Sequence, residues 1–162
     1  MVAESTDLNL ILDEVIADFD YRIEEKKAAI HKTKLPILTG VPSQLRQLFQ
    51  NLLSNSLKFT RQDVDPVITV TAETIADKSF DSELSENGNY CRITVTDNGI
   101  GFNEVYLDKI FKIFQSLNDR NAYEGTGIGL AIANKIIEKH NGIITAKSSP
   151  GSGASFIMVL PL

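Results

Sequence analysis

Two asparagines and a lysine lie at helical spacing in the apolar segment NLLSNSLKF, residues 51–59. Asn51 and Asn55 are four residues apart, so a helix places them on one face, and Lys58 follows three residues later near that face. An amide oxygen is a hard ligand that suits Mg²⁺, and a lysine can neutralise a phosphate. Asparagine and lysine also form ordinary solvated helix faces, so the segment alone leaves this second interpretation open.

A second candidate for a functional segment is DNGIGF, residues 97–102, which follows an alternating β-strand pattern. Asn-Gly is typical of a hairpin turn, but the pattern after it is helical, and a hairpin does not explain Gly101. The other interpretation is a pocket in which Gly99 and Gly101 bring the backbone against a flat ring. The carboxylate of Asp97 could then accept a hydrogen bond from an exocyclic amine such as N6 of adenine. The segment alone fits both interpretations about equally.

Three glycines alternate at Gly125, Gly127 and Gly129, directly before a helical pattern. Glycine lets a ligand approach the main chain, and free N–H groups at a helix start attract anions. A dinucleotide fingerprint is disfavoured because no buried strand precedes these glycines and no acidic residue follows ~20 positions on. The chain also lacks a Walker phosphate loop. The favoured interpretation is a phosphate-binding helix start with a mobile loop before it, and the alternative is a hinge.

Apolar periodicity predicts the elements that position these three segments. The predicted helices are 7–27, 42–60, 104–114 and 126–141, and the predicted strands are 66–75, 90–97, 143–149 and 154–162. Residues 28–38 are expected to be extended, and the acidic stretch 76–89 is expected to be the most mobile loop. Helices that interleave with strand pairs favour an α+β fold, a two-layer α/β sandwich with a mostly antiparallel sheet.

Local signals suggest where the first and last helices begin and end. Ser5, Thr6 or Asp7 is expected to cap the first helix, and the chain is expected to enter that helix directly from its N-terminus. Gly142 is expected at the C′ position of the last helix.

Composition excludes several functional classes. The net charge of −5 argues against a general nucleic-acid binder or direct contact with an anionic membrane. No apolar run approaches the ~18 residues of a membrane span. Cys91 is the only cysteine, so the chain has no internal disulfide and no cysteine metal cluster. These features favour a cytoplasmic location for this domain, whether or not a full-length protein is tethered to a membrane.

Taken together, the motifs resemble the catalytic, ATP-binding domain of sensor histidine kinases. This family lies within the superfamily of gyrase-type topoisomerases, ninety-kilodalton heat-shock chaperones and mismatch-repair ATPases. QLFQNLLSNSLKFT resembles the N box, DNGIGF the G1 box, IFKIF the F box and GTGIGLAIANKIIEKHNG the G2 box. The run from the F box to the G2 box is similar to phytochrome-like and PAS-linked kinases. The resemblance implies a Bergerat-type fold that uses ATP and Mg²⁺.

The resemblance also implies a role for individual residues. At the phosphates and the metal ion it implies Asn51 and Lys58 as catalytic residues, Asn55 as the Mg²⁺ ligand and Phe59 beside the nucleotide. At the base it implies Asp97, Gly99 and Gly101. In the lid, roughly 115–125, and its borders it implies Phe111, Phe114 and Arg120. At the start of the G2 helix it implies Gly125, Thr126, Gly127, Gly129 and Leu130.

One position separates kinases from hydrolases in this superfamily. The hydrolases carry a glutamate four residues before the metal-binding asparagine, where this chain has Asn51. An amide cannot act as a general base at neutral pH, which favours phosphoryl transfer to an external nucleophile over hydrolysis. His31 and His140 do not lie in an acceptor-like context, and the resemblance implies an acceptor histidine on a separate dimerisation domain, absent here.

The sequence is therefore expected to be a single catalytic domain, residues 1–162, and a monomer when isolated. Expected partners are the nucleotide, a histidine-bearing dimerisation domain in the same chain or in trans, and a response regulator receiver domain. Ser116 replaces a common lid arginine, which favours the alternative of a degenerate nucleotide-binding signalling module. A stand-alone protein serine kinase of the anti-sigma-factor type shares these boxes and is the other alternative.

Overall fold

The computed structural model describes residues 2–106 and 126–162. Its elements are, in chain order, β1 (Glu4–Asp7), α1 (Leu8–Asp18), α2 (Asp20–Lys26), β2 (Ala29–Lys32), β3 (Ile37–Gly40), α3 (Pro42–Lys58), β4 (Val67–Ile75), β5 (Tyr90–Asp97), the 3₁₀ helix η1 (Glu104–Tyr106), α6 (Thr126–Lys139), β6 (Ile143–Ser148) and β7 (Ala154–Pro161). The helix predicted over 104–114 begins as η1, and its remainder lies outside the described residues.

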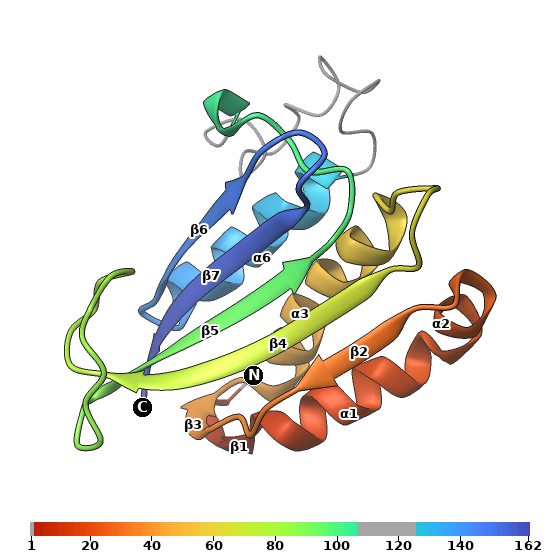
Figure 1. The fold of residues 1–162 in the computed structure, drawn as a ribbon. Coiled ribbons are helices and arrows are strands. Elements are labelled where there is room, and N and C mark those ends of the chain that lie inside the picture. Colours follow the sequence, from red (N-terminus) through yellow and green to blue (C-terminus); the bar gives the residue numbers. More distant parts are fainter. Residues whose placement is uncertain (1, 107–125) are drawn as a thin grey trace.

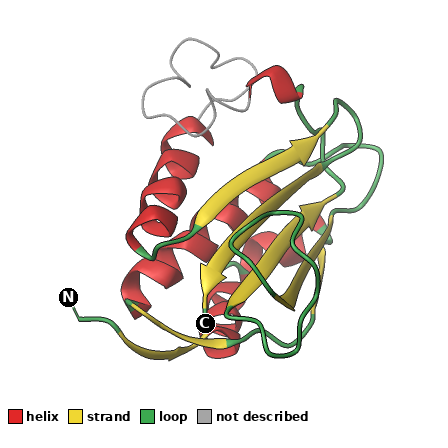
Figure 2. Ribbon diagram, turned by 90° about the vertical axis from the view of Figure 1, so that its left-hand side faces the viewer, coloured by secondary structure: helices red, strands yellow, loops and turns green. Residues whose placement is uncertain are grey.

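A five-stranded sheet in the order β2-β4-β5-β7-β6 forms one layer of the domain. β2 pairs with β4 in parallel, and the other neighbours are antiparallel. Helices α1, α3 and α6 lie across one face of this sheet (Figure 1), and the view from the side shows two layers (Figure 2). The predicted two-layer sandwich with a mostly antiparallel sheet is confirmed.

The core lies between the sheet and the helices. Alternate residues of β5, namely Cys91, Ile93 and Val95, are buried, and so are Leu48 and Leu52 of α3. The strand residues follow the period of two and the helix residues the period of about four that the sequence pattern predicts. The buried side chains of α3 and β5 therefore belong to one core cluster, and these two elements carry two of the candidate motifs.

The N-terminus differs from the prediction. The chain does not enter the first helix directly, because Glu4–Asp7 forms β1, which pairs antiparallel with β3 as a separate two-stranded sheet. Of the three candidate caps, Asp7 is the one observed: its Oδ1 accepts a hydrogen bond from the backbone N–H of Asn9 at 2.9 Å. An acceptor at this position satisfies an N–H group that the helix itself leaves unpaired.

The predicted helix 7–27 is two helices. Phe19 takes a non-helical backbone conformation (φ −99°, ψ 11°) between α1 and α2, and its N–H bonds to the carbonyls of Val15 and Ile16. Phe19 and Ile23 both pack against the core as half-buried side chains. The apolar spacing continues across the break, which is why the periodicity alone predicts a single helix.

Helices α3 and α6 are packed together and run antiparallel. His140, just beyond α6, accepts a hydrogen bond through Nε2 from the backbone N–H of Val41, the N-cap of α3, at 3.0 Å. Its Nδ1 lies 2.8 Å from the carbonyl of Ile136, to which it donates. The end of α6 is thereby tied to the start of α3, and the first turn of α6 lies toward the C-terminal end of α3 (Figure 1).

Asn141 holds the C′ position of α6, where Gly142 was expected. It has the positive φ of 61°, and its N–H bonds to the carbonyl of Glu138, while Gly142 N–H bonds to the carbonyl of Ile137. This pair of bonds is the Schellman arrangement, in which asparagine is tolerated in place of glycine. Gly142 is needed for space instead, because a Cβ there would lie 2.4 Å from the carbonyl oxygen of Val159.

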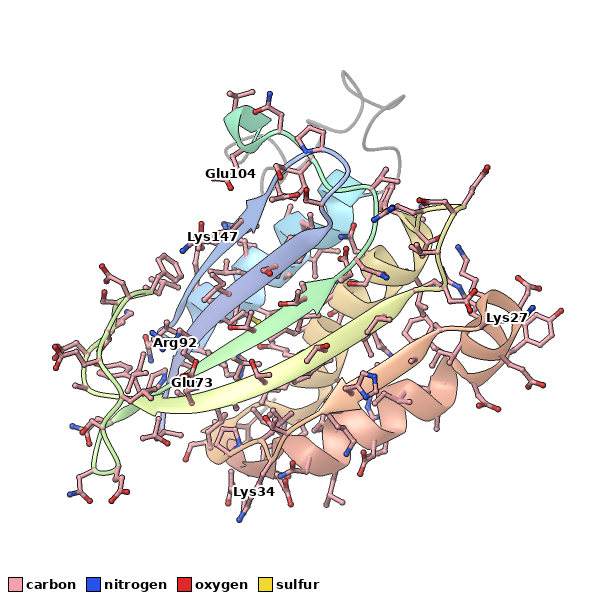
Figure 3. The ribbon with its side chains drawn as sticks, viewed as in Figure 1. Lys27, Lys34, Glu73, Arg92, Glu104 and Lys147 are labelled. Carbon is pink, nitrogen blue, oxygen red and sulfur yellow. The ribbon has the colours of Figure 1, made fainter. Side chains whose placement is uncertain are left out.

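The acidic stretch 76–89 is held to the sheet by hydrogen bonds, unlike the open loop that its composition suggests. Arg92 of β5 donates through one guanidinium nitrogen to the carbonyls of Phe80 and Ser82, at 3.0 and 2.9 Å. Its other terminal nitrogen pairs with Glu73 of β4 at 3.3 Å, and these two side chains lie side by side in Figure 3. Arg92 therefore ties the loop to both β4 and β5.

Candidate functional site

The carboxylate of Asp97 lies at the C-terminal end of β5 and is bound by three donors. Its Oδ1 accepts hydrogen bonds from the backbone N–H groups of Gly99, at 2.9 Å, and Ala154, at 3.2 Å. Its Oδ2 accepts one from the hydroxyl of Ser56, at 3.2 Å. The donors come from α3, the turn after β5 and the start of β7, so the carboxylate joins three parts of the fold.

Burial raises the pKa of Asp97 above its usual value, because a carboxylate loses solvation when it is withdrawn from water. The hydrogen bonds from Gly99, Ser56 and Ala154 act in the opposite direction, since they favour the charged form. Burial is the larger effect. A half-buried carboxylate with a raised pKa at the end of a strand is a common feature of a binding site.

The two glycines of the turn are required by close backbone contacts. A Cβ at Gly99 would lie 2.2 Å from the carbonyl oxygen of Phe59. Gly101 has a positive φ of 67°, and a Cβ there would lie 2.2 Å from the carbonyl oxygen of Ser149. The backbone N–H of Ile100 also donates to the Phe59 carbonyl at 3.0 Å. The turn after β5 is thus in direct backbone contact with the C-terminal end of α3.

Asn98 anchors the same turn to the start of β4. Its Oδ1 accepts a hydrogen bond from the N–H of Val67 at 2.8 Å, and its Nδ2 donates to the carbonyl of Asp65 at 3.1 Å. Sequence reasoning missed Asn98 and Ser56 as parts of the site. The only available signal for Ser56 was a hydroxyl within an apolar helical run.

The N-box residues lie on the last two turns of α3, beside Asp97. Asn51 and Asn55 are half-buried, and Lys58 is exposed at the last residue of the helix. Phe59 is the C-cap, and its N–H bonds to the carbonyl of Asn55 at 3.2 Å. The structure thus brings these four residues to the same end of the domain as the glycine turn.

The side-chain oxygen of Asn55 has no hydrogen-bond partner. Across the described residues, Asn55 Oδ1 is the one buried side-chain nitrogen or oxygen atom that lacks a hydrogen-bond partner. Leaving a buried acceptor unpaired costs about 1–3 kcal/mol, so such an atom calls for an explanation. An amide oxygen is a hard donor and is suited to a cation such as Mg²⁺, which usually takes one or two protein oxygens and keeps several waters.

The G2 segment is described only from the start of α6. Thr126, Gly127 and Gly129 lie in the first turn of this helix, and Leu130 is buried, with 1% of its surface exposed. Because α3 and α6 are antiparallel, this first turn lies toward the end of α3 that carries the N box. Phe111, Phe114, Arg120 and Gly125 lie outside the described residues.

Other chemistry is not supported in the part of the chain that the structure describes. No group of three or more His, Cys, Asp or Glu side chains could hold a metal ion within residues 2–106 and 126–162. Burial raises the pKa of the Cys91 thiol to about 11, which leaves it protonated and unreactive at neutral pH. Within the same ranges, no helix has the length and apolar character to cross a bilayer.

A mixed sheet covered on one face by helices, with a half-buried acid at the end of the central strand, is the arrangement of the Bergerat class of α/β sandwich. The chain belongs to the family of histidine kinase-, DNA gyrase B- and HSP90-like ATPases, whose family model matches residues 40–162. The resemblance inferred from the motifs is confirmed. Membership identifies the chain as an ATPase-type catalytic domain of the kind found in histidine kinases.

Individual relatives support this assignment. The phytochrome-like protein Cph1 of Synechocystis is 38% identical over 157 residues, which cover 97% of this chain and 19% of that protein. The nucleotide-free catalytic domain of histidine kinase ThkA is 25% identical, with a TM-score of 0.76, covering 99% of this chain and 96% of the ThkA domain. Full-length ShkA in complex with AMPPNP is 25% identical, with a TM-score of 0.76, covering 98% of this chain and 31% of that one. The chain thus spans about a fifth of the length of the curated relative.

Proposed function

We propose that this domain binds ATP with Mg²⁺ and donates the γ-phosphoryl group to a histidine on a separate dimerisation domain. The proposal rests on two neighbouring groups. One is the half-buried carboxylate of Asp97, which is bonded to Ser56 of α3, and the other is the unpaired side-chain oxygen of Asn55, the residue before Ser56. The first suits the amine of adenine and the second suits the metal ion that accompanies the phosphates.

Each described residue of the site has a proposed part. Asp97 accepts a hydrogen bond from the exocyclic amine, and Gly99 and Gly101, which pack against Phe59 and Ser149, hold the turn that lines the ring. Asn55 holds Mg²⁺, which when bound neutralises charge on the phosphates. Lys58 contacts phosphate oxygens. The proposed remainder of the site consists of Asn51 at the phosphates, Phe59 beside the nucleotide, and Thr126, Gly127, Gly129 and Leu130 at the start of α6.

The residue types favour transfer over hydrolysis. Asn51 is an amide and cannot take a proton from water at neutral pH. Phosphoryl transfer requires mainly positioning and charge neutralisation from the protein, which backbone N–H groups, Lys58 and a metal ion supply. In the proposed step the bond from Pγ to the bridging oxygen breaks as a bond to an imidazole nitrogen forms, and ADP leaves.

The acceptor histidine is proposed to lie outside residues 1–162. His140 has both ring nitrogens engaged with Val41 and Ile136, and His31 lies on the exposed edge strand β2. The phosphohistidine is proposed to pass its group to a response regulator receiver domain; ThkA, a relative in fold, has been solved in complex with the response regulator TrrA. Use of ATP as the donor favours a cytoplasmic location, and the isolated domain is proposed to be a monomer.

A calorimetric titration with AMPPNP, with and without Mg²⁺, tests nucleotide binding. We expect saturable 1:1 binding that Mg²⁺ strengthens and that is weaker for GMPPNP. Asp97→Ala should abolish the preference for adenine, whereas Asp65→Ala, a matched control that removes an exposed carboxylate near the same turn, should not. No binding of AMPPNP at millimolar concentration would refute the proposal.

Phosphoryl transfer is tested separately. The domain is incubated with [γ-³²P]ATP and a histidine kinase dimerisation domain supplied in trans, with a His→Gln variant of that domain as the control. We expect label on the dimerisation domain that acid removes, as phosphohistidine requires. Acid-stable label would instead indicate a serine kinase, and nucleotide binding without any transfer to several dimerisation domains would favour a degenerate signalling module.

A further inference from the structure

Ser56 is a buried hydroxyl that the proposed function leaves without a part. It lies on α3, next to Asn55, with 2% of its surface exposed. Thr6 is the only other buried polar side chain in the ranges that the structure describes, and its hydroxyl donates to the backbone carbonyl of Glu4. The hydroxyl of Ser56 instead donates to the side chain of Asp97, 41 positions away in the sequence.

The two side-chain oxygens of Asp97 differ in the hydrogen bonds that they accept. Oδ1 accepts two backbone N–H groups, from Gly99 and Ala154, and a carboxylate oxygen has about two lone-pair sites. Among residues 2–106 and 126–162, Ser56 is the one donor to Oδ2. The remaining acceptor capacity of the carboxylate therefore lies on Oδ2, and the bond from Ser56 helps to fix the direction of that oxygen.

We propose that Ser56 is a positioning residue that presents Oδ2 of Asp97 to the exocyclic amine of adenine and thereby contributes to selection of adenine over guanine. The inference rests on the proposed function, because it assumes that the site takes a purine nucleotide. Adenine carries an amine donor at position 6, whereas guanine carries a carbonyl acceptor. An oriented acceptor oxygen attracts the adenine amine and repels the guanine carbonyl. The site then discriminates between the two bases because guanine leaves a polar group of the site unpaired.

The same contact acts on the charge of Asp97. Burial raises the pKa of Asp97, and the hydrogen bond from Ser56 is one of three that lower it. Across the described residues, no charged side chain is among the groups that shift this pKa. Ser56 is thus the one side chain that favours the ionised, acceptor-only form, which an amine requires. A protonated carboxyl could donate to the guanine carbonyl and would discriminate less.

The test compares Ser56→Ala, which removes the donor, with Ser56→Thr, which retains a hydroxyl, and Ser56→Cys, which retains the size with a weaker donor. Calorimetric titration of each variant with AMPPNP and GMPPNP in Mg²⁺ gives the preference for adenine. We expect Ser56→Ala to weaken AMPPNP binding by about 3- to 10-fold, the net value of one hydrogen bond, with GMPPNP binding unchanged or stronger. Thr should restore most of the preference.

Thr6→Val is the matched control, because it removes the other buried hydroxyl far from Asp97. We expect it to lower stability without changing the preference between the two nucleotides. Equal weakening of AMPPNP and GMPPNP by Ser56→Ala, or an unchanged preference, would overturn the proposal.

A measurement without ligand separates this inference from the proposed function. The ¹³C NMR signal of the Asp97 carboxyl reports its titration in the nucleotide-free domain, and Ser56→Ala should move the midpoint to higher pH, while Ser56→Thr should not. An unchanged midpoint would overturn the role of Ser56 even if the domain binds ATP. Failure of the wild-type domain to bind AMPPNP would overturn the proposed function, and with it base selection by Ser56, whatever the NMR result.

Discussion

Replacing Asn55 with leucine should stabilise the ligand-free domain while it removes the effect of Mg²⁺ on nucleotide binding. Asn55 Oδ1 is buried without a partner, and such an acceptor costs about 1–3 kcal/mol. Leucine branches at the same carbon, carries no polar atom and has the higher helix propensity, which contributes about 0.5 kcal/mol. Leucine is also larger than asparagine, and fitting the larger side chain at this half-buried position offsets part of the gain, by about 1 kcal/mol.

The expected net effect is therefore a gain of about 1–2 kcal/mol in the free energy of unfolding. For a domain of 162 residues this corresponds to a rise in Tm of about 2–8 °C. Urea denaturation followed by circular dichroism gives the change, provided that the m-value stays constant. The same variant, titrated with AMPPNP, should bind with an affinity that no longer depends on Mg²⁺.

Asn9→Leu is a control substitution, which is expected to lower the stability of the domain where Asn55→Leu raises it. Its Oδ1 accepts from the N–H of Leu35 and its Nδ2 donates to the carbonyl of the same residue, both at 2.8 Å. Asn9→Leu leaves two backbone groups unpaired and should cost about 2–3 kcal/mol. If Asn55→Leu lost stability as Asn9→Leu does, the side-chain oxygen of Asn55 would have a partner in solution, and the argument for a metal ligand held ready on α3 would be refuted.

Three further predictions test the physical account. Folding raises the pKa of Asp97 above its usual value of 3.8, so between the two values the folded state binds more protons, and stability falls as pH rises through this window. Asp97→Asn should therefore stabilise the ligand-free domain at pH 7 and have no effect below the window, as measured by urea denaturation at several pH values. His140→Ala should cost about 2–3 kcal/mol in the same assay, because it leaves Val41 N–H unpaired. Gly101→Ala combines a positive φ with a backbone clash, whereas Gly151→Ala has the positive φ and open space around it. The second should cost about 1–2 kcal/mol and the first clearly more; equal thermal shifts would contradict the contact with Ser149.

The elements that carry the site were predictable where local pattern determines them. The apolar spacing of α3 with Pro42 at its first turn predicted 42–60, against the observed Pro42–Lys58. The polar run of β1 has no alternation to signal a strand; it forms because β3 provides a pairing partner. The break between α1 and α2 at Phe19 was not predictable either, because the apolar period continues through it.

The residue types of the site were predictable from the sequence, whereas the hydrogen bonds that join its residues were not. Motif spacing brought out Asp97 and Asn55, but the bond from Ser56 to Asp97 joins positions 41 apart. The contact of Ile100 with the Phe59 carbonyl joins positions of similar separation. Such contacts depend on how α3 packs against β5, and no local periodicity encodes that packing.

The features that destabilise the free domain gather at one end of it. Asn55 carries an unpaired acceptor, Asp97 carries a charge that burial disfavours, and Gly101 holds a left-handed backbone conformation. A ligand with an amine donor and a bound cation would relieve the first two costs, so part of its binding free energy comes from the removal of these costs. Binding at 100 times Kd stabilises a protein by about 2.7 kcal/mol whatever the source of affinity. At one fixed concentration of Mg²⁺ and AMPPNP, the rise in Tm should therefore be largest for the wild-type domain and smaller for Asn55→Leu and Asp97→Asn, even though both variants start from a more stable free state.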